Sequence, residues 1–247
     1  MLASLKRMFG RAGNERDLSE IEAWARRRGH GFKRVRNEDG FVIDGWLEGK
    51  PWRIEWGTPQ RAYIEGHELR LRMELDLSGE TQMLVLSRPL MDSLERKTFE
   101  EFTDSVQTQI GTKTPEEMRW LVMFPKVNLA SMKVLRNRFG AVASAPDVGL
   151  LWIEGPLANM LENAATEWLL DEQPLVLMTL RGRAYLRLQL ASPEPKTVSA
   201  ALALFETAVV QAVRAAGGTI DRSADAGRST AWQSFPPDDR DAPPKRR

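Results

Sequence analysis

A period-two alternation of apolar and charged side chains between residues 32 and 77 constrains the fold more than any other feature of the chain. The apolar positions are Trp52, Ile54, Trp56, Leu69, Leu71, Met73, Leu75 and Leu77. The positions between them are Arg53, Glu55, Arg70, Arg72, Glu74 and Asp76. Because successive side chains of a strand point to opposite faces, this pattern predicts antiparallel strands with one buried and one charged face. Glycine-containing breaks at 37–40, 48–50 and 65–68 predict tight turns.

A short passage appears twice in the chain, and its copies, residues 85–95 and 152–162, align without a gap. Each copy resembles an apolar strand, a two-residue polar turn, Pro-Leu and an amphipathic helix. Proline suits the first helical turn because its missing N–H is not needed there. The repeat predicts a strand–strand–helix unit used twice, with Pro89 superposing on Pro156 and residues 71–110 on residues 138–171.

The remaining patterns complete an α+β fold of antiparallel sheets with flanking helices, in two lobes related by this partial duplication. Residues 17–28 and 197–216 have helical periodicity, and residues 175–180 and 184–190 form a hairpin pattern. The helix that begins at Pro89 should bury Leu94, and the one that begins at Pro156 should bury Leu161. The predicted divisions are a flexible amphipathic segment (1–13), a first lobe (14–126), a second lobe (127–217) and a disordered polar, proline-rich tail (218–247).

Residues 139–195 combine a strand at 139–144, an Asp-containing turn, and a second apolar strand at 150–153. A helix that starts with proline, a hairpin with a basic-Gly turn and a polar exit with proline follow. This order resembles an uncharacterised bacterial domain family of unknown function. The resemblance implies an α+β fold and transfers no activity.

Composition narrows the function classes. The chain has 247 residues, a net charge of +1 and no cysteine, which excludes disulfides, thiolate metal sites and cysteine nucleophiles. The near-neutral charge predicts no nucleic-acid partner. No targeting segment or membrane span is evident, so we expect a cytoplasmic protein. His30 and His67 are the two histidines, and neither has a second histidine at ligand spacing, so no metal or cofactor is expected.

The charged residues offer two candidate surfaces, one acidic and one basic. Carboxylates at 100, 101, 104, 116 and 117 fall where solvated charges are expected, so a catalytic pair in a desolvated cleft is not indicated. Arg53, Arg61, Arg70 and Arg72 could form an anion-binding face, but the glutamates on the same strands favour cross-strand ion pairs.

The two ends of the chain carry the predicted contact residues. Leu2, Leu5, Lys6, Arg7, Phe9 and Arg11 would form a basic amphipathic helix able to dock on an anionic membrane surface or a partner. Trp232 and Phe235 in the polar tail are typical of short partner-binding segments.

The sequence therefore predicts a non-catalytic protein-interaction module, with a second expected contact at the inner face of a membrane. The alternative is a carboxylate-dependent hydrolase with its site between the lobes. Partner identity and oligomeric state stay open.

Overall fold

The computed structural model describes residues 18–35, 39–104 and 114–217. A helix over residues 18–27 comes first. The elements that follow are β1 (Gly31–Arg34), β2 (Phe41–Leu47), β3 (Lys50–Gly57), β4 (Glu68–Glu74), β5 (Met83–Ser87), α2 (Arg88–Asp104), α3 (Glu116–Met123), α4 (Lys133–Arg138), β6 (Phe139–Ala143), α5 (Pro146–Ile153), α6 (Pro156–Glu167), β7 (Leu175–Leu180), β8 (Arg183–Gln189) and α7 (Pro195–Ala215).

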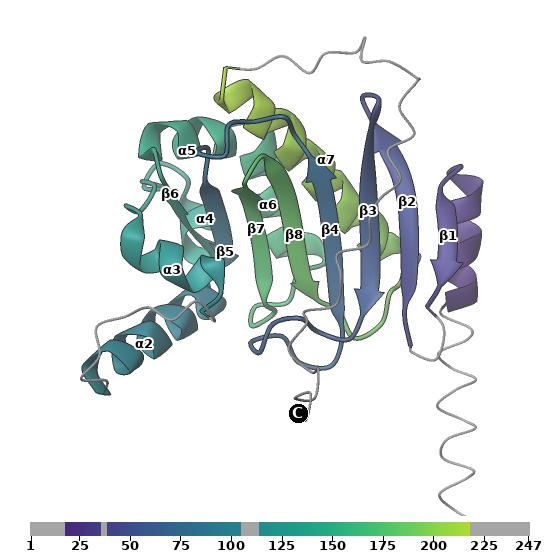
Figure 1. The fold of residues 1–247 in the computed structure, drawn as a ribbon, viewed down its shortest axis with the longest axis horizontal. Coiled ribbons are helices and arrows are strands. Elements are labelled where there is room, and N and C mark those ends of the chain that lie inside the picture. The colour runs from purple at the N-terminus through teal and green to yellow at the C-terminus, as the bar shows by residue number, and fades with distance from the viewer. Residues whose placement is uncertain (1–17, 36–38, 105–113, 218–247) are drawn as a thin grey trace, which may run out of the picture.

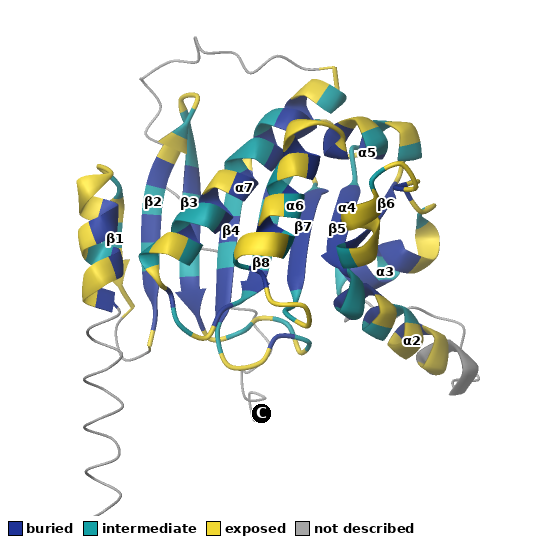
Figure 2. Ribbon diagram, turned by 180° about the vertical axis from the view of Figure 1, so that it is seen from behind, coloured by how far each residue is buried: buried dark blue, intermediate teal, exposed yellow. Residues whose placement is uncertain are grey.

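All eight strands form one antiparallel sheet in the order β1-β2-β3-β4-β8-β7-β5-β6 (Figure 1). Helices α4, α5, α6 and α7 cover one face, which we call the back face (Figure 2). The main core lies between them and the inward side chains of the strands, and the helix over residues 18–27 adds Leu18, Ile21 and Trp24 to it. The predicted alternation is confirmed here, because Trp52, Ile54 and Trp56 are fully buried on this face.

The opposite, front face is divided in two. Over β5, β6 and β7, helices α2 and α3 pack on it and enclose a second apolar cluster. Leu84, Leu86 and Val142 supply the strand side of this cluster, and Leu94 and Trp120 supply the helix side. We call this part the covered half. Over β1–β4 and β8 no described helix packs on the front face, and we call this part the open half (Figure 1).

Two hairpins depend on residues with positive φ. The β2–β3 turn has Glu48 at φ 49° and Gly49 at φ 77°, and the β7–β8 turn has Arg181 at φ 51° and Gly182 at φ 73°. Two consecutive positive φ values match the right-handed twist of the strands that the turn joins. At Gly182 a Cβ atom would also lie 2.8 Å from the Leu77 carbonyl oxygen, so the close approach of the two chains requires glycine.

Helix α7 is long and apolar enough to span a membrane by length and composition, alone among the helices of the described residues, and 56% of its most apolar stretch is buried. It packs on α5, α6 and the back of β4 and β8. Its buried side chains include Val198, Leu204, Phe205 and Val209. Packing against the sheet therefore accounts for its apolar composition.

The α+β class is confirmed, and so is the burial of Leu94 and Leu161. The strand predicted at residues 150–153 is wrong, because these residues belong to α5. Pro146 and Asp147 stand in its first turn, and Gly149 lets the helix approach β6, since a Cβ there would come within 2.8 Å of Ala143 and Val127. A four-residue apolar run has no periodicity that separates strand from helix.

The repeat is correspondingly different in its two copies. Pro89 is the second residue of α2 and follows β5 directly. Pro156 begins α6, but it follows α5 and Gly155, whose φ is 75°. Both prolines lie at helix starts, as expected. The preceding elements are a strand in one copy and a helix in the other, so the predicted strand–strand–helix duplication is not what the two copies form.

The sheet also crosses the predicted boundary between the first lobe (14–126) and the second lobe (127–217). β4 pairs with β8, and β5 lies between β7 and β6. Strands assigned to two lobes thus alternate within one sheet. Phe102, Val106 and Ile110, which continue the helical pattern of Leu94 in the sequence, lie outside the described side chains, so their burial stays a prediction.

Candidate functional surface

The open half carries a ladder of charged side chains in cross-strand rows. In one row Asp44 pairs in register with Arg53, Arg53 with Arg72, and Arg72 with Tyr185. The next row continues from Glu55 on β3 to Arg70 and Arg187. The cationic side chains of this half are Lys33, Arg53, Arg70, Arg72, Arg183 and Arg187. Its carboxylates are Asp44, Glu55, Glu68 and Glu74.

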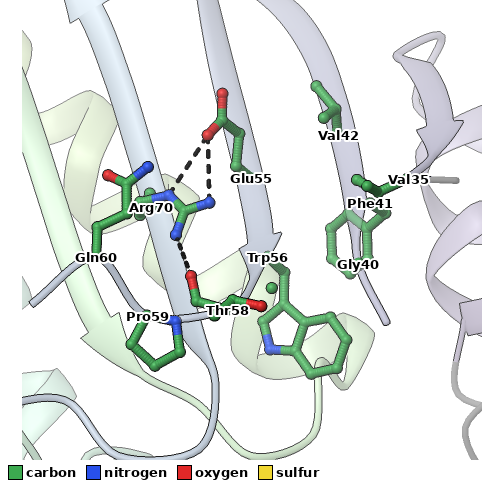
Figure 3. A pocket seen from close by; sticks show the side chains of 11 residues that line it. Val35, Gly40, Phe41, Val42, Glu55, Trp56, Thr58, Pro59, Gln60 and Arg70 are labelled. Carbon is green, nitrogen blue, oxygen red and sulfur yellow. Dashed lines mark hydrogen bonds and ion pairs between the residues drawn. The ribbon is translucent and has the colours of Figure 1, made fainter. Parts of the chain in front are cut away.

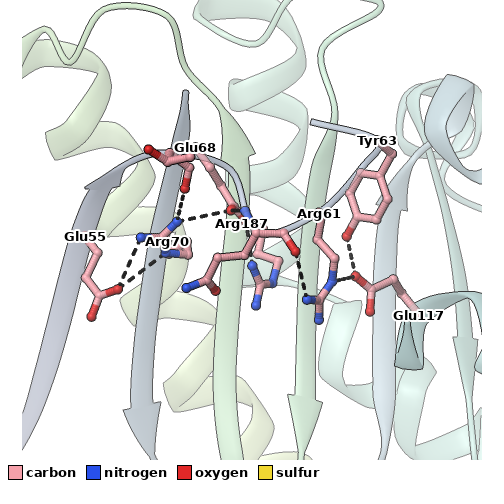
Figure 4. A network of polar contacts seen from close by, with 9 residues as sticks. Glu55, Arg61, Tyr63, Glu68, Arg70, Glu117 and Arg187 are labelled. Carbon is pink, nitrogen blue, oxygen red and sulfur yellow. Dashed lines mark hydrogen bonds and ion pairs between the residues drawn. The ribbon is translucent and has the colours of Figure 1, made fainter. Parts of the chain in front are cut away.

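Most of these charges are paired across strands, as the sequence predicted (Figure 4). Arg53 Nε donates to Asp44 Oδ1 at 2.7 Å. Arg70 donates to Glu55 at 3.4 Å and to Glu68 at 3.2 Å. Arg72 also pairs with Glu55, at 3.3 Å, and its Nε is buried without a hydrogen-bond partner. The face is therefore rich in arginine, pre-organised and slightly cationic.

Glu68 anchors one end of the open half. Its side chain is fully buried and accepts hydrogen bonds from Arg187 Nη1 at 2.6 Å and from the Gln60 backbone N–H at 2.7 Å. The loop over residues 58–67 folds across the ends of β4 and β8, and Glu65 N–H donates to Gln189 Oε1 at 2.8 Å. This carboxylate holds the β3–β4 loop against the sheet and was not singled out by the sequence.

A second buried carboxylate joins the same loop to α3. Arg61 Nε donates to Glu117 Oε1 at 2.6 Å, and the Tyr63 hydroxyl donates to the same oxygen (Figure 4). The Glu117 side chain has no exposed surface, so the expectation that it is a solvated first-turn charge is wrong. The sequence Thr114-Pro115-Glu116-Glu117 is typical of a helix start, but contacts from a distant loop bury the second residue of α3.

The electrostatics of this cluster fix its protonation. Burial alone would raise the pKa of Glu117, but the charge and hydrogen bond of Arg61 outweigh it and hold that pKa below its ordinary value. Burial raises the pKa of Tyr63, so its hydroxyl stays protonated and donates. An ionised carboxylate and a neutral phenol form a structural clamp between loop and helix.

A hollow of about 310 Å³ opens beside this network on β2 and β3 (Figure 3). Gly40 and Gly57 line it beside the register pair of Phe41 with Trp56, and a Cβ at Gly40 would lie 2.7 Å from the Trp56 carbonyl oxygen. Arg70 and Glu55 form its polar wall and are bonded to each other, and Arg70 Nη1 also donates to the Thr58 carbonyl oxygen at 2.8 Å. Its charges are thus engaged within the protein.

Trp46 stands at the far end of the open half. It pairs in register with Pro51, next to the β2–β3 turn, and its side chain is 70% exposed. Tryptophan is highly buried on average, and it is enriched at protein interfaces. Trp46 was not among the predicted contact residues, although it shares the phase of Asp44 rather than that of Phe41 and Ile43.

The two histidines take part in packing. His67 stacks on the Trp56 indole with ring centroids 4.4 Å apart, so its turn position does not leave the imidazole simply solvated. The His30 ring packs edge-on against Trp52 at 4.8 Å, and the His30 backbone N–H donates to the Ala25 carbonyl oxygen at 2.9 Å. Burial and the nearby Arg28 lower the pKa of His30. In the described part of the chain no group of three potential metal-ligating side chains is found.

The predicted contact residues at the ends of the chain lie outside the described residues. These are Leu2, Leu5, Lys6, Arg7, Phe9, Arg11, Trp232 and Phe235. The structure therefore places none of them relative to the open half.

The chain was compared with protein families, curated proteins and solved structures, and one solved structure resembles it weakly. No family model and no curated protein matches the chain. Among solved structures, the crystal structure of the mycobacterial trehalose monomycolate transport factor A resembles it with a TM-score of 0.46 and 6% identity. The likeness covers 80% of this chain and 94% of that chain. At this TM-score it carries no argument, and the resemblance of residues 139–195 to an uncharacterised bacterial family stays a prediction.

Proposed function

We propose that this chain is a non-catalytic, cytoplasmic protein-interaction module that docks an acidic segment of a partner protein on the open half of its sheet. The observation that carries the proposal is Trp46, 70% exposed at the end of a face rich in arginine. Exposed tryptophan and arginine are the residue types that most often dominate binding energy at protein interfaces.

Charge supports the acidic character of the partner segment. Cations outnumber carboxylates on the described open half, whereas the whole chain is nearly neutral at +1. Arg53 and Arg72 lie opposite each other in register, and the Arg72 side chain is 36% exposed. Guanidinium groups held in place by neighbouring carboxylates can still receive a further carboxylate through their remaining N–H donors.

The hydrolase alternative has less support. A general acid near neutral pH needs a carboxyl group whose pKa is raised. Glu117 has the opposite shift, and Glu68 accepts hydrogen bonds from two arginines. Burial does raise the pKa of Glu206 on α7, but this residue lies on the back-face helix layer, away from the open half.

A second contact is proposed for residues 1–13, whose basic, amphipathic pattern would suit the inner face of an anionic membrane. Sedimentation with vesicles that contain an anionic lipid tests it. Deleting residues 1–13 should abolish co-sedimentation, and added salt should weaken it. Vesicle binding that survives the deletion would assign the contact to another surface.

Fluorescein-labelled poly-L-glutamate is a direct probe for the main proposal, with poly-L-lysine as the control polymer. Fluorescence anisotropy with the full chain should show binding to polyglutamate that weakens as salt is added. Trp46→Ala, and separately the double variant Arg53→Gln with Arg72→Gln, should each weaken it by about tenfold or more. Arg27→Gln removes an exposed cation from the helix over residues 18–27 and should leave binding unchanged. No polyglutamate binding, or equal binding by all variants, would overturn the proposal.

A further inference from the structure

A second hollow, of about 360 Å³, lies at the outer edge of β6, away from the open half. The start of α2, residues 126–130 and α4 surround it. Residues 125–127 run beside β6, where Val127 N–H donates to the Ala141 carbonyl at 2.9 Å. This hydrogen bond holds residues 125–127 along the edge of β6.

Three cations line this hollow, and only one of them has a carboxylate partner. Lys126 pairs with Glu95 at 2.9 Å. The Arg88 guanidinium donates to the carbonyl oxygens of Arg136 at 3.0 Å and Phe139 at 2.9 Å, which fixes its position but leaves its charge uncompensated. Arg136 is exposed, and no described acidic group pairs with it. The hollow thus has an excess of positive charge.

The remaining lining suits a compact ligand. Gly140 forms part of the inner wall, and a Cβ there would lie 2.0 Å from the Met91 sulfur and 3.2 Å from an Arg88 nitrogen. Glycine at this position therefore lets α2 lie close against β6 and places Arg88 in the wall. Asn128 accepts a hydrogen bond from the Ala130 N–H through its side-chain oxygen at 3.0 Å, which leaves its amide nitrogen as a further donor at the hollow.

We propose that this hollow binds a phosphate group, either of a small phosphomonoester or of a lipid headgroup. Two arginines and a lysine around one cavity are the donors that typically hold phosphate, because guanidinium groups supply paired N–H donors and the ammonium adds a point charge. A volume of about 360 Å³ falls within the range of small-ligand pockets. This site is independent of the acidic-segment surface, because it lies at the opposite edge of the sheet.

The test uses the full chain in phosphate-free buffer. ¹H–¹⁵N NMR spectra are recorded during titration with inorganic phosphate and glycerol 3-phosphate. Saturable shifts of the amide signals of residues 126–130 and 140–141 are expected. Sedimentation with phosphatidylcholine vesicles, with and without phosphatidic acid, distinguishes the two sources of phosphate. Binding of inorganic phosphate or glycerol 3-phosphate without binding to vesicles assigns a small molecule, and preferential binding of phosphatidic acid vesicles assigns a headgroup.

Arg136→Gln is the decisive variant, because the Arg136 side chain has no described protein contact whose loss would affect folding. It should weaken phosphate binding by about tenfold or more. Lys133→Gln makes the same charge change on an exposed residue of the same helix that does not line the hollow, and it should bind like wild type. The proposal is overturned if neither phosphate source binds, if the shifts fall elsewhere, or if Arg136→Gln and Lys133→Gln bind equally.

Discussion

The covered and open halves of the front face are parts of one sheet, and the same cross-strand rows run through both. Their side chains nevertheless have opposite character, apolar in the covered half and charged in the open half. One cross-strand row runs from Asp44 through Arg53, Arg72 and Tyr185 to Met178, and then to Leu84 and Val142. The change from charged to apolar falls between β8 and β7, where α2 and α3 begin to cover the sheet. The sheet is continuous there, so the helices and not the strands define the boundary.

This contrast separates two uses of one scaffold. In the covered half, the front-face side chains stabilise the fold by excluding water. In the open half the partly exposed ion pairs, such as those of Arg53 and Arg72, are typically worth only about 0–1 kcal/mol each. The pairs of the buried Glu68 are the exception, and they hold the loop over residues 58–67 against the sheet. The open half therefore presents a charged, uncovered face held in place by its own ion pairs, which makes it suitable for binding.

The largest effect that tests this comparison is expected in the covered half. Leu94 on α2 is 1% exposed within the front cluster, so Leu94→Ala should destabilise the protein by about 2–5 kcal/mol through lost burial and the cavity left behind. Urea denaturation measures the change. Lys97→Ala, on the exposed side of the same helix, should lie within about 0.5 kcal/mol of wild type. Equal midpoints for both variants would mean that α2 does not hold the front cluster together.

The next effect concerns the clamp at the border of the two halves. Glu117→Gln should destabilise by about 1–3 kcal/mol, because Arg61 loses its ionic partner and the buried amide cannot accept both hydrogen bonds equally. Glu116→Gln, one residue earlier and partly exposed, should cost less. Chemical denaturation of the three proteins at neutral pH gives the comparison.

The clamp also predicts a pH dependence. The pKa of Glu117 is lowered in the folded protein, so its stabilisation is present above the ordinary carboxyl pKa and is lost as the pH falls through the folded value. The difference in unfolding free energy between wild type and Glu117→Gln should therefore shrink as the pH falls below about 4.5. A difference that stays constant down to pH 2 would contradict an ionised, stabilising Glu117.

Local patterns predicted much of the fold. The alternation around Trp52 and Trp56, the Gly49 and Gly182 turns and the long final helix all depend on neighbouring residues, and all are confirmed. The insertion of β5 between β7 and β6 depends on contacts between distant segments. Sequence periodicity contains no information about such pairings.

The candidate surface was predicted in part for the same reason. Arg53, Arg70 and Arg72 were assigned to one face with cross-strand partners, because strand periodicity fixes both. The burial of Glu117 was missed, since its partners Arg61 and Tyr63 come from a loop more than 50 residues earlier in the chain. Trp46 carried a usable signal, because its phase within β2 is that of the charged face and not that of the buried Phe41 and Ile43.

A smaller effect is expected from the open half. Arg72→Gln removes a partly exposed guanidinium whose pair with Glu55 is 3.3 Å long, so the loss of stability should not exceed about 1 kcal/mol. Urea denaturation beside Leu94→Ala compares the two halves directly. A loss as large as that of Leu94→Ala would show that the charged row is part of the structural core and would remove the distinction between the halves.

The smallest expected effect tests whether the open half is open in the full chain. Residues 1–13 and 219–247 were predicted to stand apart from the core, so deleting either should leave the thermal midpoint nearly unchanged. Hydrogen exchange of β2, β3 and β4 should also be the same with and without residues 219–247.

If Trp232 and Phe235 instead cover the face beside Trp46, the deletion will speed hydrogen exchange there, and the double variant Trp232→Ala with Phe235→Ala will reproduce that increase. The acidic-segment surface would then be occupied by the chain's own tail, and a partner would have to displace it. A fall of several degrees on deleting residues 1–13 would place Leu2, Leu5 and Phe9 in the core rather than at a membrane.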